Sequence, residues 1–256
     1  MVAATLLVTT MLSTHAQTEK PAFSPASPAA AAVAPALDHY AETTLRNDLW
    51  KRTDLSVRDR SIVTLVILIT RNQTEEQSKY LRLALDSGVK PREVAEIITH
   101  LAFYAGWGNA MAALAVAKDV FRERNIGVDQ LPAATPQFLS LDRAAEDSRA
   151  ALVEESIGSV SPGLVHFTGE LLFKNLWLRP DLASRDRSLV TVTALIASGQ
   201  TAQITFHLNR ALDSGLTPKE AGEVLTQAAF YAGWPNAFSA AAVFKAVFES
   251  RQPAKR

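Results

Sequence analysis

The amino-acid sequence predicts an all-α fold in which two similar helical units are related by a pseudo-twofold axis. The chain carries nearly the same motifs twice at one constant offset, since Asp59 recurs 127 positions later as Asp186 (186 − 59 = 127). Apolar residues recur at intervals of three and four, which is typical of amphipathic helices. No stretch shows the convincing alternation of apolar and polar residues that a half-buried strand requires. These three observations together predict tandem helical units.

The repeat also predicts the domain boundaries. One unit is expected at 33–124 and the second at 160–251, with a connector at 125–159 that contains one further helix. A chain of 256 residues is long enough for two ordinary domains of about 100 residues each. The two units therefore account for most of the chain.

The helices of each unit have recognisable start and stop signals. Ser56 precedes an apolar run as a hydroxyl cap, and Thr217 with Glu220 forms a capping-box pattern before another run. Gly88 and its repeat Gly215 follow helical segments where a left-handed residue is needed. These signals place one helix at about 202–214, and a further amphipathic helix is expected at about 142–157.

The amino end differs in composition from the rest of the chain. Residues 1–16 contain an apolar run of signal-peptide length, which is too short to span a bilayer, and residues 17–32 are a Pro/Ala-rich spacer that we expect to be disordered. This pattern favours a periplasmic or secreted protein. The alternative is a disordered tail on a cytoplasmic protein.

Composition excludes several classes of function. The 26 basic residues balance the 26 acidic residues, so the chain lacks the positive charge expected of a nucleic-acid partner. It contains no cysteine, which excludes disulfides and thiolate nucleophiles. Five histidines without H-x-x-x-H or H-E-x-x-H spacing do not predict a metal site.

Three consecutive motifs carry a family resemblance. The second unit reads W-L-R-P-D-L from Trp177, R-D-R-S-L-V-T from Arg185 and F-Y-A-G-W-P-N-A from Phe230, with close copies in the first unit. Together these motifs closely resemble the carboxymuconolactone decarboxylase family over both units. The resemblance implies all-helical units that assemble into rings, commonly trimers of dimers. We therefore expect a homo-oligomer, a trimer of two-unit chains.

The resemblance also implies chemistry on one helix. One branch of the family resembles alkylhydroperoxidase and uses C-x-x-C-x-x-x-H, which the absence of cysteine excludes here. The other branch converts 4-carboxymuconolactone to 3-oxoadipate enol-lactone and carbon dioxide without a cofactor, and its helix usually reads E-L-x-x-H. This chain departs from that pattern twice. The second unit has Gln203 and His207 at the two positions, whereas the first has Glu76 and Tyr80.

His207 is the leading catalytic candidate, because an imidazole on the apolar face of a helix can exchange a proton near neutral pH. The alternative is a core histidine bonded to a backbone carbonyl. Arg187 and Glu76 complete the predicted catalytic set, the arginine steering a carboxylate or contacting a lactone oxygen and the glutamate reaching the same cavity from the other unit. The predicted substrate-binding residues are Arg60, Tyr80, Tyr104, Gln203, Tyr231 and Trp234.

Each of these candidates has a structural alternative. The arginines of the two R-D-R-S motifs could instead pair with their neighbours Asp59 and Asp186 at the helix start. The aromatic residues could be packing residues. For the function itself we expect cofactor-independent decarboxylation, or related proton transfer, on a small carboxylated lactone. The alternatives are an exported ligand-binding or scaffold protein and a thiol-independent oxidoreductase or isomerase of the same fold.

Overall fold

The structure of the protein is a computed structural model that describes residues 24–252. The chain divides into two compact units, one ending at Asp48 and the other beginning at Leu49. The leader predicted at 1–16 lies outside the described residues, and it stays a prediction together with the compartment and the homo-oligomer. Within the described part of the chain, no helix combines the length and apolar character needed to cross a bilayer.

The first compact unit contains short helical elements. These are α1 (Pro28–Val33), α2 (Pro35–Tyr40) and a π-helical turn at Ala41–Arg46. Helix α1 corrects the expectation of a disordered spacer for the part of 17–32 that is described. Its N-terminus is capped because the Ser27 side chain accepts a hydrogen bond from the backbone N–H of Ala30, and Pro28 occupies the first turn.

The second compact unit holds the main helices of both repeats. In the first repeat these are α3 (Val57–Thr70), α4 (Thr74–Asp86), α5 (Pro91–Tyr104) and α6 (Trp107–Glu123), and in the second they are α9 (Ser184–Ala197), α10 (Thr201–Asp213), α11 (Pro218–Tyr231) and α12 (Trp234–Ser250). Between them lie α7 (Arg143–Ile157) and α8 (Pro162–Phe167), and short 3-10 helices occupy Leu49–Lys51, Val128–Gln130 and Leu176–Leu178. A π-helical turn follows α8 at Thr168–Phe173. The residues described contain no strand, so the all-α prediction is confirmed.

Local signals fix the ends of these helices as the sequence predicts. The Ser56 hydroxyl accepts a hydrogen bond from the backbone N–H of Asp59 at 3.1 Å, and Thr217 forms a capping box with Glu220. Gly88 and Gly215 both have positive φ, +97° and +101°. A side chain at either position would be strained, which explains glycine after α4 and α10.

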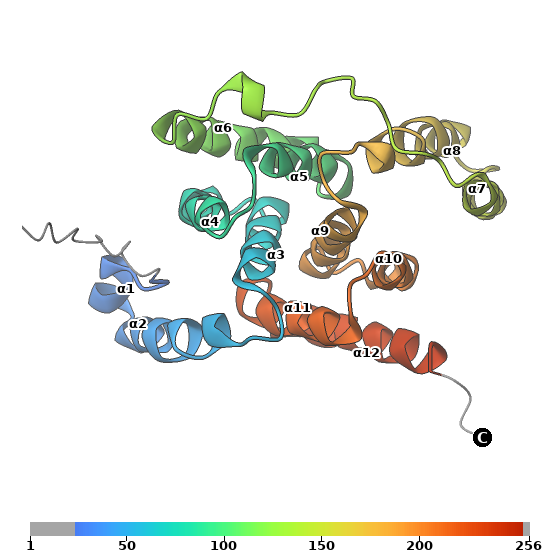
Figure 1. The fold of residues 1–256 in the computed structure, drawn as a ribbon. Helices are drawn as coiled ribbons and strands as arrows, with labels where there is room; N and C mark the ends of the chain where they lie inside the picture. Colours follow the sequence, from blue (N-terminus) through green and yellow to red (C-terminus); the bar gives the residue numbers. More distant parts are fainter. Residues whose placement is uncertain (1–23, 253–256) are drawn as a thin grey trace, which may run out of the picture. The chain divides into compact units, whose positions relative to one another are not determined.

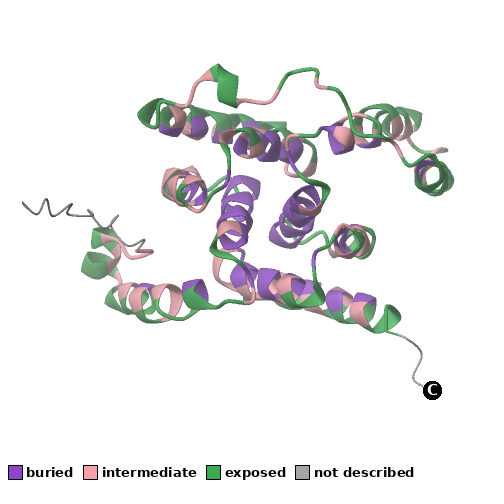
Figure 2. Ribbon diagram, in the orientation of Figure 1, coloured by how far each residue is buried: buried purple, intermediate pink, exposed green. Residues whose placement is uncertain are grey.

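Helices α3 and α9 form the centre of the core. They pack against each other between α5 on one side and α11 on the other (Figure 1). Both are buried over 12 consecutive residues, which Figure 2 shows as continuous burial along the two helices. A helix that is buried all round needs neighbours on every face. The two repeats therefore share one hydrophobic core from Leu49 onward, rather than forming two separate cores.

The packing crosses between the repeats. Helix α5 of the first repeat packs on α9 of the second, and α11 of the second repeat packs on α3 of the first. Side chains from one repeat consequently reach helices of the other. Each of the two equivalent sites described below contains residues of both repeats.

Candidate functional site

An aromatic cluster surrounds His207 on α10. The imidazole stacks on the Trp177 indole with ring centroids 5.9 Å apart and meets the Tyr104 ring edge-on at 5.4 Å. The Trp177 Nε1–H donates a hydrogen bond to the Tyr104 hydroxyl at 2.9 Å. Tyr104 comes from α5 of the first repeat, so both repeats are needed to hold this ring in place.

His207 borders a cavity of about 360 Å³. The lining residues are Phe103, Tyr104, Arg149, Leu152, Val153, Thr168, Leu172, Phe173, Leu195, Gln203, Phe206 and His207. The wall is mostly apolar with a few polar groups, which is typical of sites for small organic ligands. Its lining contains no carboxylate, so a bound anion would meet no direct repulsion from the wall.

The His207 imidazole has no hydrogen-bond partner among the described residues, although only 7% of the residue is exposed and Nδ1 is buried. Burial, together with the smaller effect of the positive charge of Arg210, lowers the pKa of this imidazole to about 4. The ring is therefore neutral at pH 7. A neutral imidazole has one N–H donor and one nitrogen acceptor to offer a ligand.

Arg149 reaches the cavity from the connector helix α7. Its Nε and Nη2 atoms donate hydrogen bonds to the two carboxylate oxygens of Glu146 at 2.8 and 2.6 Å, and both side chains are buried. The guanidinium carbon lies 4.2 Å from the centre of the Phe173 ring. Its third nitrogen, Nη1, is buried without a partner among the described residues.

Arg210 brings a second guanidinium to the same cluster. Its central carbon lies 4.1 Å from the centre of the Trp177 ring and 5.7 Å from that of Phe173. In the described part of the chain it forms no ion pair with a carboxylate. Burial lowers the pKa of Arg210 from its ordinary value, although an arginine stays charged at neutral pH. The surroundings of His207 are therefore electropositive.

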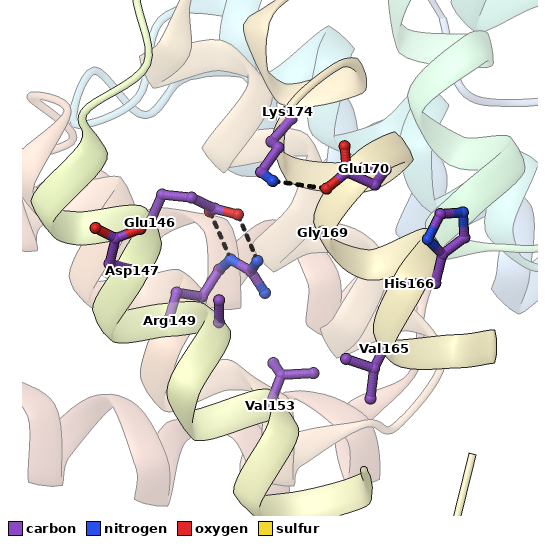
Figure 3. Close-up of a pocket in the computed structure, with 10 residues that line it drawn as sticks. Glu146, Asp147, Arg149, Val153, Val165, His166, Gly169, Glu170 and Lys174 are labelled. Carbon is purple, nitrogen blue, oxygen red and sulfur yellow. Dashed lines mark hydrogen bonds and ion pairs between the residues drawn. The ribbon is translucent and has the colours of Figure 1, made fainter. Parts of the chain in front are cut away.

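A second space of about 210 Å³, here called the outer hollow, also has Arg149 in its lining. Figure 3 shows the Arg149–Glu146 pair on α7 facing the segment that carries Glu170 and Lys174, which form their own ion pair at 2.6 Å. Arg149 lines both this hollow and the cavity of His207. Arg149 therefore borders both spaces, one with several charged residues in its lining and the other with a mostly apolar lining.

Comparison with known proteins agrees with the repeated motifs. The model of the carboxymuconolactone decarboxylase family matches two segments, residues 35–119 and 162–246, which together make up more than half of the chain. The chain belongs to the carboxymuconolactone decarboxylase family. The two matches fall within the two predicted units, so the resemblance found in the sequence is confirmed.

Two decarboxylases resemble this family member over shorter stretches. A 4-carboxymuconolactone decarboxylase of Acinetobacter baylyi is 31% identical over 84 residues, which are 33% of this chain and 63% of that protein. A nitrosuccinic acid decarboxylase of Metarhizium robertsii is 31% identical over 71 residues, which are 28% of this chain and 50% of that protein. The chain thus spans between half and two thirds of the length of these relatives.

In this family member, Arg187 is fully buried and does not line the cavity of His207. Its Nη2 atom donates a hydrogen bond to the Glu96 carboxylate at 3.0 Å, and the same carboxylate accepts a bond from Arg179 at 2.8 Å. The Nε atom of Arg187 is buried without a partner among the described residues, but it does not reach the cavity of His207. These contacts favour a role in joining α9 to α5 of the other repeat.

Arg60 repeats this arrangement on the other side. It is fully buried and pairs with Glu223 at 2.6 Å, again across the repeats. The alternative expectation, an ion pair of each arginine with the aspartate that precedes it, is wrong. Asp59 pairs with Arg58 and Arg185, and Asp186 pairs with the same two arginines. The partner of a buried arginine is set by packing between distant helices, which local sequence does not reveal.

Tyr80 occupies the position equivalent to His207 in the first repeat. Its hydroxyl lies 2.9 Å from the Tyr231 hydroxyl, which also accepts a hydrogen bond from the Trp50 Nε1–H at 2.9 Å. Burial raises the pKa of Tyr231 to about 12 and that of Tyr80 above its ordinary value. Both phenols are therefore neutral, and they bond to each other rather than to a ligand.

The remaining predicted residues divide between the cavity and the surface. Gln203 and Tyr104 line the cavity with His207. Glu76 is exposed and lies 3.5 Å from Lys79, and it does not line that cavity. Trp234 is also exposed and packs edge-on against Phe230. The structure therefore brings together three of the nine predicted residues, and the predicted sharing of the cavity by Glu76 is not observed.

His100 is a further member of the aromatic cluster, which the sequence analysis did not single out. It is fully buried, and its Nε2 lies 2.7 Å from the Thr191 hydroxyl. The ring stacks on Tyr104 with centroids 4.7 Å apart, and burial holds its pKa well below the ordinary value. The spacing of four residues between His100 and Tyr104 on one helix was the available signal, because such residues share a face.

Arg149 and Arg210 were also missed, for a different reason. Arg149 lies in the connector outside both repeats, and Arg210 has Leu83 as its counterpart in the first repeat. A comparison of the two repeats therefore does not single out either residue. For metals, the described residues contain no cluster of three or more histidine, cysteine, aspartate or glutamate side chains that could hold an ion.

Proposed function

We propose that this member of the carboxymuconolactone decarboxylase family decarboxylates a small carboxylated lactone, or a carboxylic acid of similar size, without a cofactor. One observation carries the proposal: the His207 imidazole borders a mostly apolar cavity and has no hydrogen-bond partner among the described residues. The two relatives, both named as decarboxylases of carboxylic acids, support the same class of reaction.

The surroundings of His207 suit this chemistry. When the bond between the ring carbon and the carboxylate breaks, carbon dioxide leaves and the electron pair passes into the unsaturated system of the lactone as an enolate. Hydrogen-bond donors and positive charge close to the enolate oxygen stabilise it as it forms. The neutral His207 N–H and the positive charge of Arg210 are such groups.

The low pKa of His207 defines how it supplies the proton. The free protein holds the ring neutral, so it first acts as a hydrogen-bond donor. An anionic substrate beside the ring favours the charged imidazolium and raises the pKa of His207. The protonated ring then delivers its proton to the carbon that lost carbon dioxide, and solvent restores the proton. Atoms and charge balance without a redox partner.

Purified protein mixed with 4-carboxymuconolactone should release carbon dioxide. His207→Asn keeps a polar side chain of smaller size but removes the titrating ring. The kcat should fall by at least about 100-fold, the lower end of the usual contribution of a general acid. Tyr80→Phe is the matched control at the equivalent position and should leave kcat unchanged. Unchanged turnover by His207→Asn would remove the histidine from the mechanism, and no turnover by the intact protein would remove the substrate assignment.

A second candidate function is ligand binding without turnover. The observation that favours it is Gln203, which lines the cavity where the decarboxylase pattern usually has glutamate and leaves the lining without a carboxylate base. A thermal-shift measurement with 4-carboxymuconolactone separates the two functions. A higher Tm without carbon dioxide release supports binding alone, whereas product formation supports catalysis.

A further inference from the structure

The connector helix α7 places a buried cation in the wall of the cavity. Arg149 is only 7% exposed, and Glu146 engages its Nε and Nη2 edge through two hydrogen bonds. The Nη1 atom on the opposite edge is buried and has no partner among the described residues. Buried N–H donors in proteins are nearly always bonded. Arg149 therefore presents donors that only a ligand or a solvent molecule can satisfy.

The charges around the cavity do not balance. Arg149 and Arg210 both lie against the Phe173 ring, with their guanidinium carbons 4.2 and 5.7 Å from its centre. Glu146, which does not itself line the cavity, supplies one negative charge to this pair, and the cavity lining contains no carboxylate. Arg149 is buried and Arg210 is half-buried, and the two cations share one carboxylate, which leaves an excess positive charge. An anion in the cavity would neutralise that excess.

We propose that Arg149 anchors the anionic group of the ligand, so that the cavity selects a small organic anion with a flat, apolar body. The anchoring contact is a charge-assisted hydrogen bond from Nη1 to a carboxylate oxygen. Glu146 is a positioning residue, because it holds the guanidinium with that edge free. Phe173, Phe206 and Leu172 supply the apolar wall beside it.

This anchor belongs to one site of the molecule only. Arg149 lies in the connector and has no repeat counterpart, and the repeat offset leads from Arg210 to Leu83, so neither cation has a basic counterpart in the first repeat. Arg149 also lies outside both segments that match the family model. The connector of this chain therefore supplies a specificity-determining residue that the repeated units do not contain.

The inference rests on the proposed function only in assigning the ligand to the same cavity, and a binding experiment tests it without turnover. Benzoate and benzamide have nearly the same shape, but only benzoate carries a negative charge. Chemical-shift titration of the full chain should show benzoate binding at least fivefold more tightly than benzamide. Equal binding of the two probes, or no measurable binding of benzoate, would overturn the proposal.

Variants assign that preference to Arg149. Arg149→Met should abolish the preference for benzoate, and Arg149→Lys should retain part of it. Arg143→Met removes an exposed arginine from the same helix, and Lys174→Met removes a cation from the outer hollow, so both should leave the preference unchanged. If Lys174→Met removed the preference and Arg149→Met did not, the anion would bind in the outer hollow and the inference would fail.

Arg149→Met alone leaves the Glu146 carboxylate buried without its partner and could prevent folding. The double variant Glu146→Gln with Arg149→Met removes both charges and keeps the test valid, provided that its thermal unfolding remains cooperative. Turnover distinguishes the two proposals. Retained benzoate preference in a protein that releases no carbon dioxide contradicts the decarboxylase, whereas carbon dioxide release with an unchanged KM in Arg149→Met contradicts the anchor.

Discussion

At equivalent positions of the two repeats, Tyr80 and His207 each stack on a tryptophan, with ring centroids 6.1 and 5.9 Å apart. In both sites that tryptophan donates a hydrogen bond of 2.9 Å to a tyrosine of the other repeat. The sites differ in the ring at the centre. Tyr80 bonds to the partner tyrosine, whereas His207 bonds to no described residue and borders a cavity.

The ion pairs behind the two sites are the same. Arg60 with Glu223 and Arg187 with Glu96 are buried pairs that tie each repeat to the other. Features that both sites share therefore hold the helices together, and features that only one site has are the candidates for chemistry. By this criterion His207, Arg149 and Arg210 are the candidates for function, and the paired arginines are the candidates for stability.

The largest expected effect on stability is the loss of the buried carboxylate behind each site, Glu96 or Glu223. Glu96→Ala leaves Arg179 and Arg187 without their partner, and we expect it to lower the free energy of unfolding by about 3–5 kcal/mol. Glu223→Ala should cost less, because 42% of the Arg52 side chain is exposed and water can solvate it. Urea unfolding of both variants measures the two losses in free energy of unfolding. An equal or larger loss for Glu223→Ala would show that exposure of the arginine partner does not set the cost.

The stability of the folded protein should depend on pH through His207. The folded-state pKa of His207 is about 4, below the ordinary value of 6.5, so the folded protein binds fewer protons than the unfolded chain. Stability is therefore lost as the pH falls from about 6.5 to about 4, by an amount on the order of 2 kcal/mol from this residue. His100 contributes in the same direction.

The His207 share can be isolated with variants at the two equivalent positions. Unfolding free energies at pH 7 and pH 4.5 should differ less for His207→Gln than for the natural protein. Tyr80→Phe removes no group that titrates in this range and should keep the full difference. An unchanged pH dependence in His207→Gln would mean that the imidazole is not held neutral by its surroundings.

The smallest expected effect is the loss of the Tyr80 hydroxyl. Tyr80→Phe removes one neutral hydrogen bond, whereas Tyr231 keeps the bond that it accepts from Trp50. We expect the free energy of unfolding to fall by about 0.5–1.5 kcal/mol. Thermal unfolding with carbon dioxide release measured in parallel checks this. A large loss of turnover would assign catalysis to the site of the first repeat as well.

The helices and part of the site were predictable from the sequence. The residues whose roles it did not predict depend on contacts between distant helices. The offset of the repeats and the capping residues located the helices, and the family motif placed Gln203 and His207 on one helix, as found. Arg187 was misassigned because its partner, Glu96, comes from a helix of the other repeat. Arg149 was missed because only the packing of the connector brings it to the cavity.

Each site of this molecule takes its central ring from one repeat and its tyrosine from the other. In an assembly of identical single units, any substitution would alter every copy of a site at once, so chemistry and interface could not change independently. Fusing two units into one chain removes that restriction. One site can then change its lining, as we propose for Arg149 of the joining segment, while the other keeps the hydrogen bonds that link the two repeats.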